Sequence, residues 1–243
     1  MRIHKTKNYD EMSRKAADLI FSQVTLKPAC VLGLATGSTP IGTYQCLIRD
    51  YAAGSLDFSE VKTVNLDEYR GLTGENEQSY RYFMNHRLFQ HINIPLSQTN
   101  IPDGIIAPGK ACSEYETLIG ELGGIDMQVL GLGHNGHIGF NEPADHFVPN
   151  THMVDLAQKT IEANTRFFEN SDDVPRQAIT MGIGTIMKAR KILLLVSGAE
   201  KADILNRVIY GPITPEVPAS ILQLHPDVTV IADEAALSKT FGV

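Results

Sequence analysis

The chain has 243 residues, of which 43% are hydrophobic and 20% charged, and its formal net charge is −7. The acidic balance argues against a dedicated nucleic-acid or anionic-membrane binder, and no apolar run approaches the roughly 18 residues of a membrane-spanning helix. The length fits a single α/β domain over 1–243, and three cysteines without CxxC spacing, behind an amino terminus that lacks a signal-peptide pattern, indicate a cytoplasmic protein.

The first half of the chain alternates helix and strand patterns. Apolar residues at helical spacing follow Asp10, the expected helix cap, and predict a helix to about Val24. The unbroken apolar run 29–35 predicts a strand buried on both faces, which is typical of a parallel sheet. Further elements are expected at 41–53 (helix), 61–66 (strand) and 79–91 (helix).

The second half continues this alternation. Elements are expected at 111–122 (helix), 125–132 (strand), 191–197 (strand), 199–210 (helix) and 228–232 (strand), while 151–190 shows no clear pattern. Strands that alternate with helices predict an open, doubly wound, mostly parallel α/β sheet with helices on both faces, Rossmann-like in class. Ligands of such sheets bind beyond the carboxyl ends of the strands. The residues after each strand are therefore the candidates for chemistry.

Two of these strand ends suit a phosphate group. Gly37, Ser38 and Thr39 combine hydroxyls and backbone N–H groups at the start of a helix, an arrangement that holds anions, although a plain helix cap would look the same. The segment matches neither the nucleoside-triphosphate nor the dinucleotide glycine motif. Lys201 follows a strand at the start of a helix, where a bound anion would offset its unfavourable charge, and Arg166 together with 36–39 can complete a phosphate clamp.

The other two strand ends suit proton transfer. Asp67, beside Glu68, follows a strand and can remove a proton from carbon, although a solvated carboxylate fits the same pattern. In the loop 133–143, His137 can shuttle a proton, and a nearby carboxylate can fix its tautomer. A metal site of His134, His137 and Glu142 is the alternative, but the spacing matches no zinc signature, so we expect no metal.

Five segments in order along the chain resemble one family. They are 32–40, 65–69, 131–143, 163–168 and 197–202, and together they resemble the glucosamine-6-phosphate deaminases, also called glucosamine-6-phosphate isomerases. The resemblance spans essentially the whole chain. It implies conversion of D-glucosamine 6-phosphate and water to D-fructose 6-phosphate and ammonia in amino-sugar catabolism, with a small-molecule sugar phosphate as the partner and no metal or organic cofactor.

The resemblance also implies catalytic roles for the proton-transfer residues. Asp67 is the base that takes the C2 proton and returns it at C1. His137, assisted by Glu142, opens the pyranose ring, and Asn135 orients His137. Many relatives carry Asp where this chain has Asn135, and because an amide does not hold an imidazolium as a carboxylate does, we expect a less basic His137.

Phosphate binding and regulation follow from the same resemblance. Gly37, Ser38 and Thr39 would hold the phosphate with Lys201 and Arg166, and Arg166 would lie on a lid at about 155–180. Allosteric relatives carry basic residues where this chain has 152–155, and they have a longer tail than the short helix expected before Val243. We therefore expect the shorter, non-allosteric type, with hyperbolic kinetics, as a monomer or small homo-oligomer.

Two other functions fit parts of the pattern. A 6-phosphogluconolactonase shares the fold and the sugar-phosphate ligand, but hydrolysis of a lactone needs no base at C2. A sugar-phosphate sensor would bind without turnover, and no DNA-binding module is apparent in the sequence. The order of Asp67 and Glu68 also stays open, because a shift of one residue at the strand end would exchange their directions.

Overall fold

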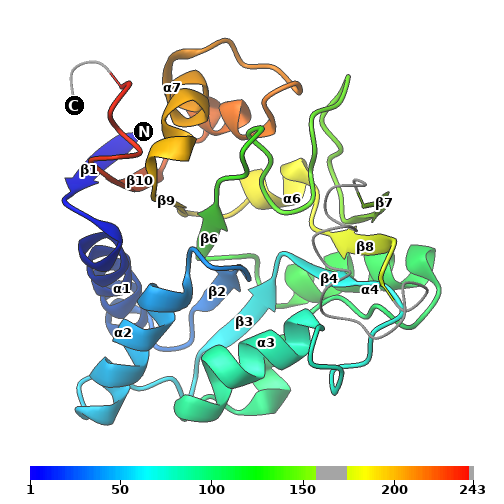
Figure 1. The fold of residues 1–243 in the computed structure, drawn as a ribbon. Coiled ribbons are helices and arrows are strands. Elements are labelled where there is room, and N and C mark those ends of the chain that lie inside the picture. The colour runs from blue at the N-terminus through cyan, green and yellow to red at the C-terminus, as the bar shows by residue number, and fades with distance from the viewer. Residues whose placement is uncertain (157–173, 241–243) are drawn as a thin grey trace.

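A seven-stranded parallel sheet forms the centre of the computed structural model, which describes residues 1–156 and 174–240 (Figure 1). The strand order is β1-β10-β9-β6-β2-β3-β5, and every neighbouring pair is parallel. The strands are β1 (Arg2–Thr6), β2 (Val31–Leu34), β3 (Lys62–Asn65), β5 (Thr99–Asn100), β6 (Met127–Gly131), β9 (Ile192–Val196) and β10 (Val228–Asp233). The mostly parallel sheet predicted from the sequence is confirmed.

Helices cover both faces of this sheet, which confirms the doubly wound arrangement (Figure 1). On one face, α1 (Tyr9–Leu26), α2 (Ile41–Ala52) and α3 (Tyr80–Arg87) contribute residues such as Met12, Tyr44 and Met84 to one buried cluster. On the other face, α4 (Pro108–Glu121), α6 (Ile183–Met187) and α7 (Ala202–Tyr210) contribute Ile119, Ile186 and Leu205 to a second cluster. Because both faces are covered, β2 and β9 are buried at every residue.

A second, smaller sheet lies beside the first and was not predicted. Its order is β4-β8-β7, with antiparallel pairing of β4 (Asp67–Tyr69), β8 (Gln177–Thr180) and β7 (His152–Asp155). β4 begins one residue after β3 ends, so the chain leaves the main sheet at Leu66. The short strands β7 and β8 fall in the segment that carries no clear periodicity, which is why the sequence did not reveal them.

Several predicted boundaries need correction. Asn8, not Asp10, caps α1, because the Asn8 side chain accepts a 3.0 Å hydrogen bond from the Glu11 N–H. The helix expected over 79–91 ends at Arg87 and continues as the 3-10 helix η1 (Phe89–His91), and the helix expected over 199–210 begins as η4 (Ala199–Lys201). Two further 3-10 helices, η2 (Leu96–Gln98) and η5 (Pro218–Leu224), complete the described elements, and 234–239 forms turns where a short helix was expected.

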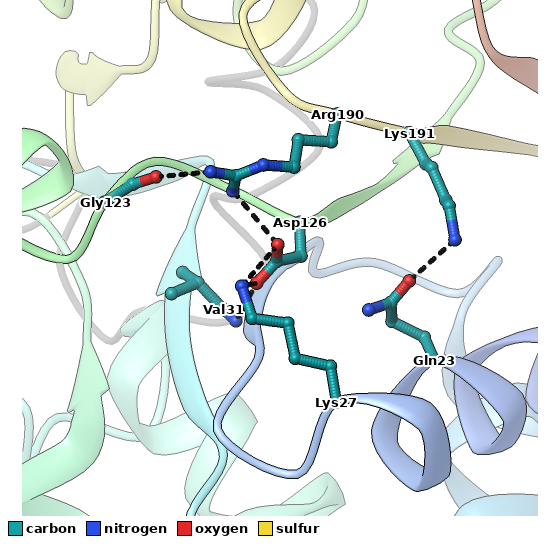
Figure 2. A network of polar contacts seen from close by, with 7 residues as sticks. All are labelled: Gln23, Lys27, Val31, Gly123, Asp126, Arg190 and Lys191. Carbon is teal, nitrogen blue, oxygen red and sulfur yellow. Dashed lines mark hydrogen bonds and ion pairs between the residues drawn. The ribbon is translucent and has the colours of Figure 1, made fainter.

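A buried carboxylate joins the amino ends of three adjacent strands (Figure 2). Asp126, 3% exposed, precedes β6 and accepts hydrogen bonds from the Val31 N–H at the start of β2, from Lys27 Nζ at 2.8 Å, and from Arg190 Nη1 just before β9. Beside it, Lys191 Nζ donates to Gln23 Oε1 of α1. Burial raises the pKa of Asp126, but the bonds from Lys27 and Val31 outweigh this effect and hold the pKa below its usual value.

We predict that Asp126→Asn lowers the free energy of unfolding at pH 7 by about 2 kcal/mol or more, because two cations and a backbone N–H lose an anionic acceptor. The folded pKa lies below the unfolded value of about 3.9, so this contribution is present above that pH and is lost as the pH falls through the folded pKa. Urea unfolding at pH 7 and at pH 3 measures both effects. Asp18→Asn, which removes an exposed partner of Arg14, is the control. An equal loss for the two variants, or an Asp126→Asn loss that is the same at both pH values, would contradict the prediction.

Candidate active site

Four strand ends meet at one cavity on the edge of the sheet opposite Asp126. The order β9-β6-β2-β3 places the carboxyl ends of these parallel strands side by side. The cavity beyond them has a volume of about 280 Å³ and contains six of the predicted site residues in its lining: Gly37, Ser38, Thr39, Asp67, His137 and Lys201. Asn135 and Glu142 both contact Nδ1 of His137. Arg166 lies outside the described residues.

The loop between β2 and α2 presents backbone donors to this cavity. Gly37 adopts a φ of 88°, which favours glycine, and so turns the chain sharply toward the helix. The N–H groups of Gly37, Ser38 and Thr39 meet no acceptor within 1–156 and 174–240. α2 has no acidic residue in its first turn and no side-chain cap. These N–H groups and the positive end of the helix dipole can therefore bind an anion.

Lys201 supplies a positive charge on the same side of the cavity. Its Nζ donates a 2.8 Å hydrogen bond to the carbonyl oxygen of Leu132, which leaves two ammonium hydrogens for a ligand. Partial burial lowers the pKa of Lys201. A bound anion would offset that cost, so Lys201 and the loop 37–39 together form a site suited to a phosphate group.

Asp67 lies on the cavity wall at the start of β4 and is 6% exposed. Burial, and after it the charge of Glu68, raises the pKa of Asp67 to about 8. Its partner in the antiparallel register of β4 and β8 is Thr180. A carboxylate whose ionised form is destabilised in this way is a stronger base than one in water, which suits the removal of a proton from carbon.

His137 belongs to a closed set of hydrogen bonds with Asn135 and Glu142. Its Nδ1 lies 2.7 Å from Asn135 Oδ1 and 3.1 Å from Glu142 Oε1, and Asn135 Nδ2 donates to Glu142 Oε2. Both groups near Nδ1 are acceptors, so Nδ1 carries the proton and Nε2 of the neutral ring is free to accept one. Burial raises the pKa of Glu142, but bonds from His137 and Asn135 outweigh it and lower the pKa.

The second sheet fixes the loop 133–143 next to Asp67. Thr180 Oγ1 accepts a 3.0 Å hydrogen bond from the Phe140 N–H, and Asn141 Nδ2 donates to the carbonyls of Ile138 and Met181. Gly139 adopts a φ of 58°, and a Cβ there would lie 2.9 Å from Thr180 Oγ1 and 3.5 Å from Asp67 Oδ2. The positive φ and the short distance to Thr180 both favour glycine at this position.

The sequence did not identify three residues of this site: the aromatic residues Tyr80 and Phe140, and Thr180. Tyr80 and Phe140 line the cavity, and their rings stack with centroids 6.1 Å apart. Tyr80 follows the α3 cap Ser79, which no catalytic motif marks, and Thr180 lies on a strand that the sequence did not reveal. One signal for Tyr80 was available in the sequence: the helix was expected to start at 79, which places this aromatic residue in the first helical turn.

The remaining expectations for the site concern metals and membranes. Within 1–156 and 174–240, no three His, Cys, Asp or Glu side chains gather in a way that can hold a metal ion. The expected absence of a metal or organic cofactor stays a prediction. The helices in these ranges include none that is both long and apolar enough to cross a membrane.

Taken together, the cavity can carry out acid–base chemistry on an anionic ligand. The buried carboxyl group of Asp67 and the imidazole of His137 line the same cavity as the anion-binding loop 37–39 and Lys201. Binding of a distant anion can position the reacting atoms between the base and the imidazole. Such an arrangement suits proton transfer between neighbouring carbons of a phosphorylated small molecule.

Comparison with known proteins agrees with this geometry. The profile of the family described as glucosamine-6-phosphate isomerases/6-phosphogluconolactonase matches residues 5–231. A glucosamine-6-phosphate deaminase of Lachnoclostridium phytofermentans is 59% identical over 232 residues, which cover 95% of this chain and 98% of that protein.

Solved structures extend the comparison to the fold. A structure of a monomeric glucosamine-6-phosphate deaminase superimposes with a TM-score of 0.93 at 46% identity, covering 98% of this chain and 100% of that one. The 6-phosphogluconolactonase of Thermotoga maritima shares the fold alone, with a TM-score of 0.77 at 18% identity and coverage of 96% and 99%. The chain therefore belongs to the glucosamine-6-phosphate isomerase/6-phosphogluconolactonase family.

Proposed function

We propose that this chain is a glucosamine-6-phosphate deaminase, which converts D-glucosamine 6-phosphate and water to D-fructose 6-phosphate and ammonia in amino-sugar catabolism. The observation that carries the proposal is the joint presence of Asp67, His137 and an anion-binding loop at one cavity. The 59% identity to a deaminase supports this substrate. Because water replaces the amine at a C–N bond, we assign the enzyme to the hydrolases acting on such bonds.

Ring opening is the first proposed step. The Nε2 of His137 accepts the proton of the C1 hydroxyl and delivers a proton to the ring oxygen, so that the C1–O bond of the ring breaks and an open-chain aldehyde forms. Glu142 and Asn135 hold Nδ1 and thereby keep Nε2 directed at the ligand. Ionised Glu142 also stabilises the imidazolium that exists between the two transfers.

Asp67 then moves a proton between carbons. It takes the proton from C2 while the substrate's own ammonium group gives a proton to the C1 oxygen, which produces an enolamine. Asp67 then returns its proton to C1, which leaves a protonated imine at C2. Water adds to this imine, the C–N bond breaks, and ammonia and fructose 6-phosphate leave. The burial of Asp67 supports this role, because a carboxylate that is poorly solvated holds a proton strongly enough to abstract it from carbon.

Phosphate binding would position the sugar for both steps. The N–H groups of Gly37, Ser38 and Thr39, together with Lys201, are suited to the phosphate oxygens. We assign Arg166 to the same phosphate and a lid to about 155–180 on a single domain of 1–243. Gln177–Thr180 at the end of this range form β8, and 157–173 lies outside the described residues. Fixing the phosphate far from C1 and C2 reduces the entropy lost in each proton transfer.

The proposal includes location and assembly. We place the enzyme in the cytoplasm, which the three free cysteines Cys30, Cys46 and Cys112 support, since a reducing compartment keeps thiols unpaired. We propose a monomer or small homo-oligomer that acts on a small sugar phosphate and binds no nucleic acid. The similarity to a structure of a monomeric deaminase supports the smaller assembly.

Two alternatives remain to be separated from the deaminase. The family also contains 6-phosphogluconolactonases, for which a base at C2 has no use, and the buried Asp67 favours the deaminase. A sugar-phosphate sensor would bind the same ligand in the same cavity but release no product. A sensor has no need of the tautomer fixed at His137 by two acceptors.

A coupled assay of ammonia and fructose 6-phosphate from glucosamine 6-phosphate tests the proposal. We expect stoichiometric release of both products, and we expect Asp67→Asn to lower kcat by about 10²- to 10⁴-fold because the amide accepts no proton. A thermal shift with the sugar phosphate shows that the variant still binds. A folded native protein without ammonia release, or a variant with native kcat, would refute the proposal.

We predict that Asn135→Asp moves the limb of the kcat/KM profile that reports His137 to higher pH, by about one unit. The new carboxylate would lie at hydrogen-bond distance from Nδ1, where it favours the imidazolium, so His137 would keep its proton to higher pH. Gln90→Glu adds the same charge at an exposed position and serves as the control. A profile that does not move would remove this role for Asn135.

We expect hyperbolic kinetics with glucosamine 6-phosphate, because His152, Met153, Val154 and Asp155 of β7 provide no Lys or Arg side chain for a second phosphate. Initial rates over a wide substrate range, with and without N-acetylglucosamine 6-phosphate, measure this. A sigmoidal curve that this compound makes hyperbolic would be the contrary result.

A further inference from the structure

Glu68 is a buried carboxylate on the opposite side of β4 from Asp67. Neighbouring residues of a strand point to opposite faces, so Asp67 lines the active-site cavity while Glu68 lines a separate cavity of about 310 Å³. Glu68 is 3% exposed. The phosphate site and the proton-transfer steps described above do not use it, although burial of a carboxylate is costly.

Three backbone N–H groups donate to Glu68. Oε1 accepts from Tyr69 at 2.8 Å and from Tyr80 at 2.9 Å, and Oε2 accepts from Arg81 at 2.9 Å. Two of these donors belong to the first turn of α3, where the helix dipole also favours an anion. The Arg81 guanidinium donates instead to Thr99, at 2.8 Å and 3.0 Å. Backbone amides therefore provide the hydrogen bonds that stabilise the Glu68 carboxylate.

The same contacts connect Glu68 to the active site. By binding the Tyr80 N–H, the carboxylate fixes the residue whose side chain lines the cavity with Asp67. The Tyr80 ring lies 4.7 Å from that of Tyr69 and 6.1 Å from that of Phe140, measured between centroids. One carboxylate thus joins β4, α3 and the wall of the cavity.

The charged and titratable groups around Asp67 come from several elements. They are Glu68 on β4, Tyr80 on α3, Tyr115 on α4, His137 in the loop 133–143, and Lys201 before α7. Arg81 and Asp103 lie on the Glu68 side. Among these groups, Glu68 is the immediate chain neighbour of Asp67, and both carboxyl groups are buried.

The two carboxyl groups differ in what stabilises their charged forms. Burial raises the pKa of Glu68 to about 7, and the N–H groups of Tyr80, Arg81 and Tyr69 oppose this rise. Burial and the charge of Glu68 both raise the pKa of Asp67, to about 8. Glu68, which accepts three backbone N–H bonds, is therefore the better stabilised anion of the two, and its charge opposes the ionisation of Asp67.

We propose that Glu68 is a positioning residue for the deaminase reaction, whose carboxylate, held by the N–H groups of Tyr69 and α3, places a fixed negative charge behind the base Asp67. The inference rests on the proposed function of Asp67. Ionised Glu68 makes Asp67 hold a proton more firmly once it has taken one from C2. It also ties the start of α3, and with it Tyr80, to the strand that carries Asp67.

The pH profile of kcat/KM for Glu68→Gln tests this proposal. Without the neighbouring charge, Asp67 ionises more readily, so the acidic limb moves to lower pH by about one unit, and the weaker base lowers kcat by about tenfold. Glu68→Asp keeps the charge and leaves the limb closer to its native position. Asp126→Asn also removes a buried carboxylate that accepts a backbone N–H, but at the amino ends of the strands, so it leaves the limb unmoved.

A second measurement follows the Asp67 carboxyl group directly. Carboxyl ¹³C NMR titration compares the Asp67 midpoint in native protein and in Glu68→Gln, and coupling requires a lower midpoint in the variant because the charge of Glu68 is gone. An unmoved limb in folded Glu68→Gln, or an unmoved Asp67 midpoint, would overturn the proposal. If native protein releases no ammonia, the proposed function fails, and the NMR titration still decides whether the two carboxyl groups are coupled.

Discussion

Parallel pairing of β9, β6, β2 and β3 is the constraint on which the site depends. Parallel strands bring all their carboxyl ends to one edge, so segments that are far apart in sequence, from Gly37 to Lys201, line a single cavity. The opposite edge of three of these strands is held by Asp126 and its cationic partners (Figure 2). One end of these strands is thus joined by the bonds of a buried carboxylate, and the other presents its polar groups to the cavity.

The second sheet adds what the parallel sheet does not provide. β4 turns out of the main sheet directly after β3, which buries Asp67 against Thr180 instead of leaving it exposed at a strand end. Thr180 also holds the Phe140 N–H, so the same contact brings the loop of His137 toward the carboxylate. The antiparallel sheet therefore sets both the basicity of Asp67 and its placement relative to the imidazole.

The sequence predicted the five central strands of the main sheet because the evidence for them is local, but it did not predict the edge strands β1 and β5. Unbroken apolar runs such as 192–196 indicate strands buried on both faces, and polar residues that follow them mark the ligand edge. It did not predict β7 and β8, whose short, mixed segments are stabilised by pairing, β8 with β4 and β7 with β8. Tyr80 and Thr180 were missed for the same reason, since pairing and packing place them at the cavity. The pairing of Asn135 with Glu142, likewise, is visible only in three dimensions.

Transfer of a labelled proton from C2 to C1 is the most direct test of the role proposed for Asp67, because one buried carboxyl group would both remove the proton at C2 and return it at C1. Glucosamine 6-phosphate carrying deuterium at C2 is converted by the native protein in ordinary water, and the fructose 6-phosphate is analysed by NMR. We predict that part of the deuterium appears at C1, since a carboxyl group that is 6% exposed exchanges slowly with solvent. Complete turnover without deuterium at C1, at every pH from 6 to 9, would contradict it.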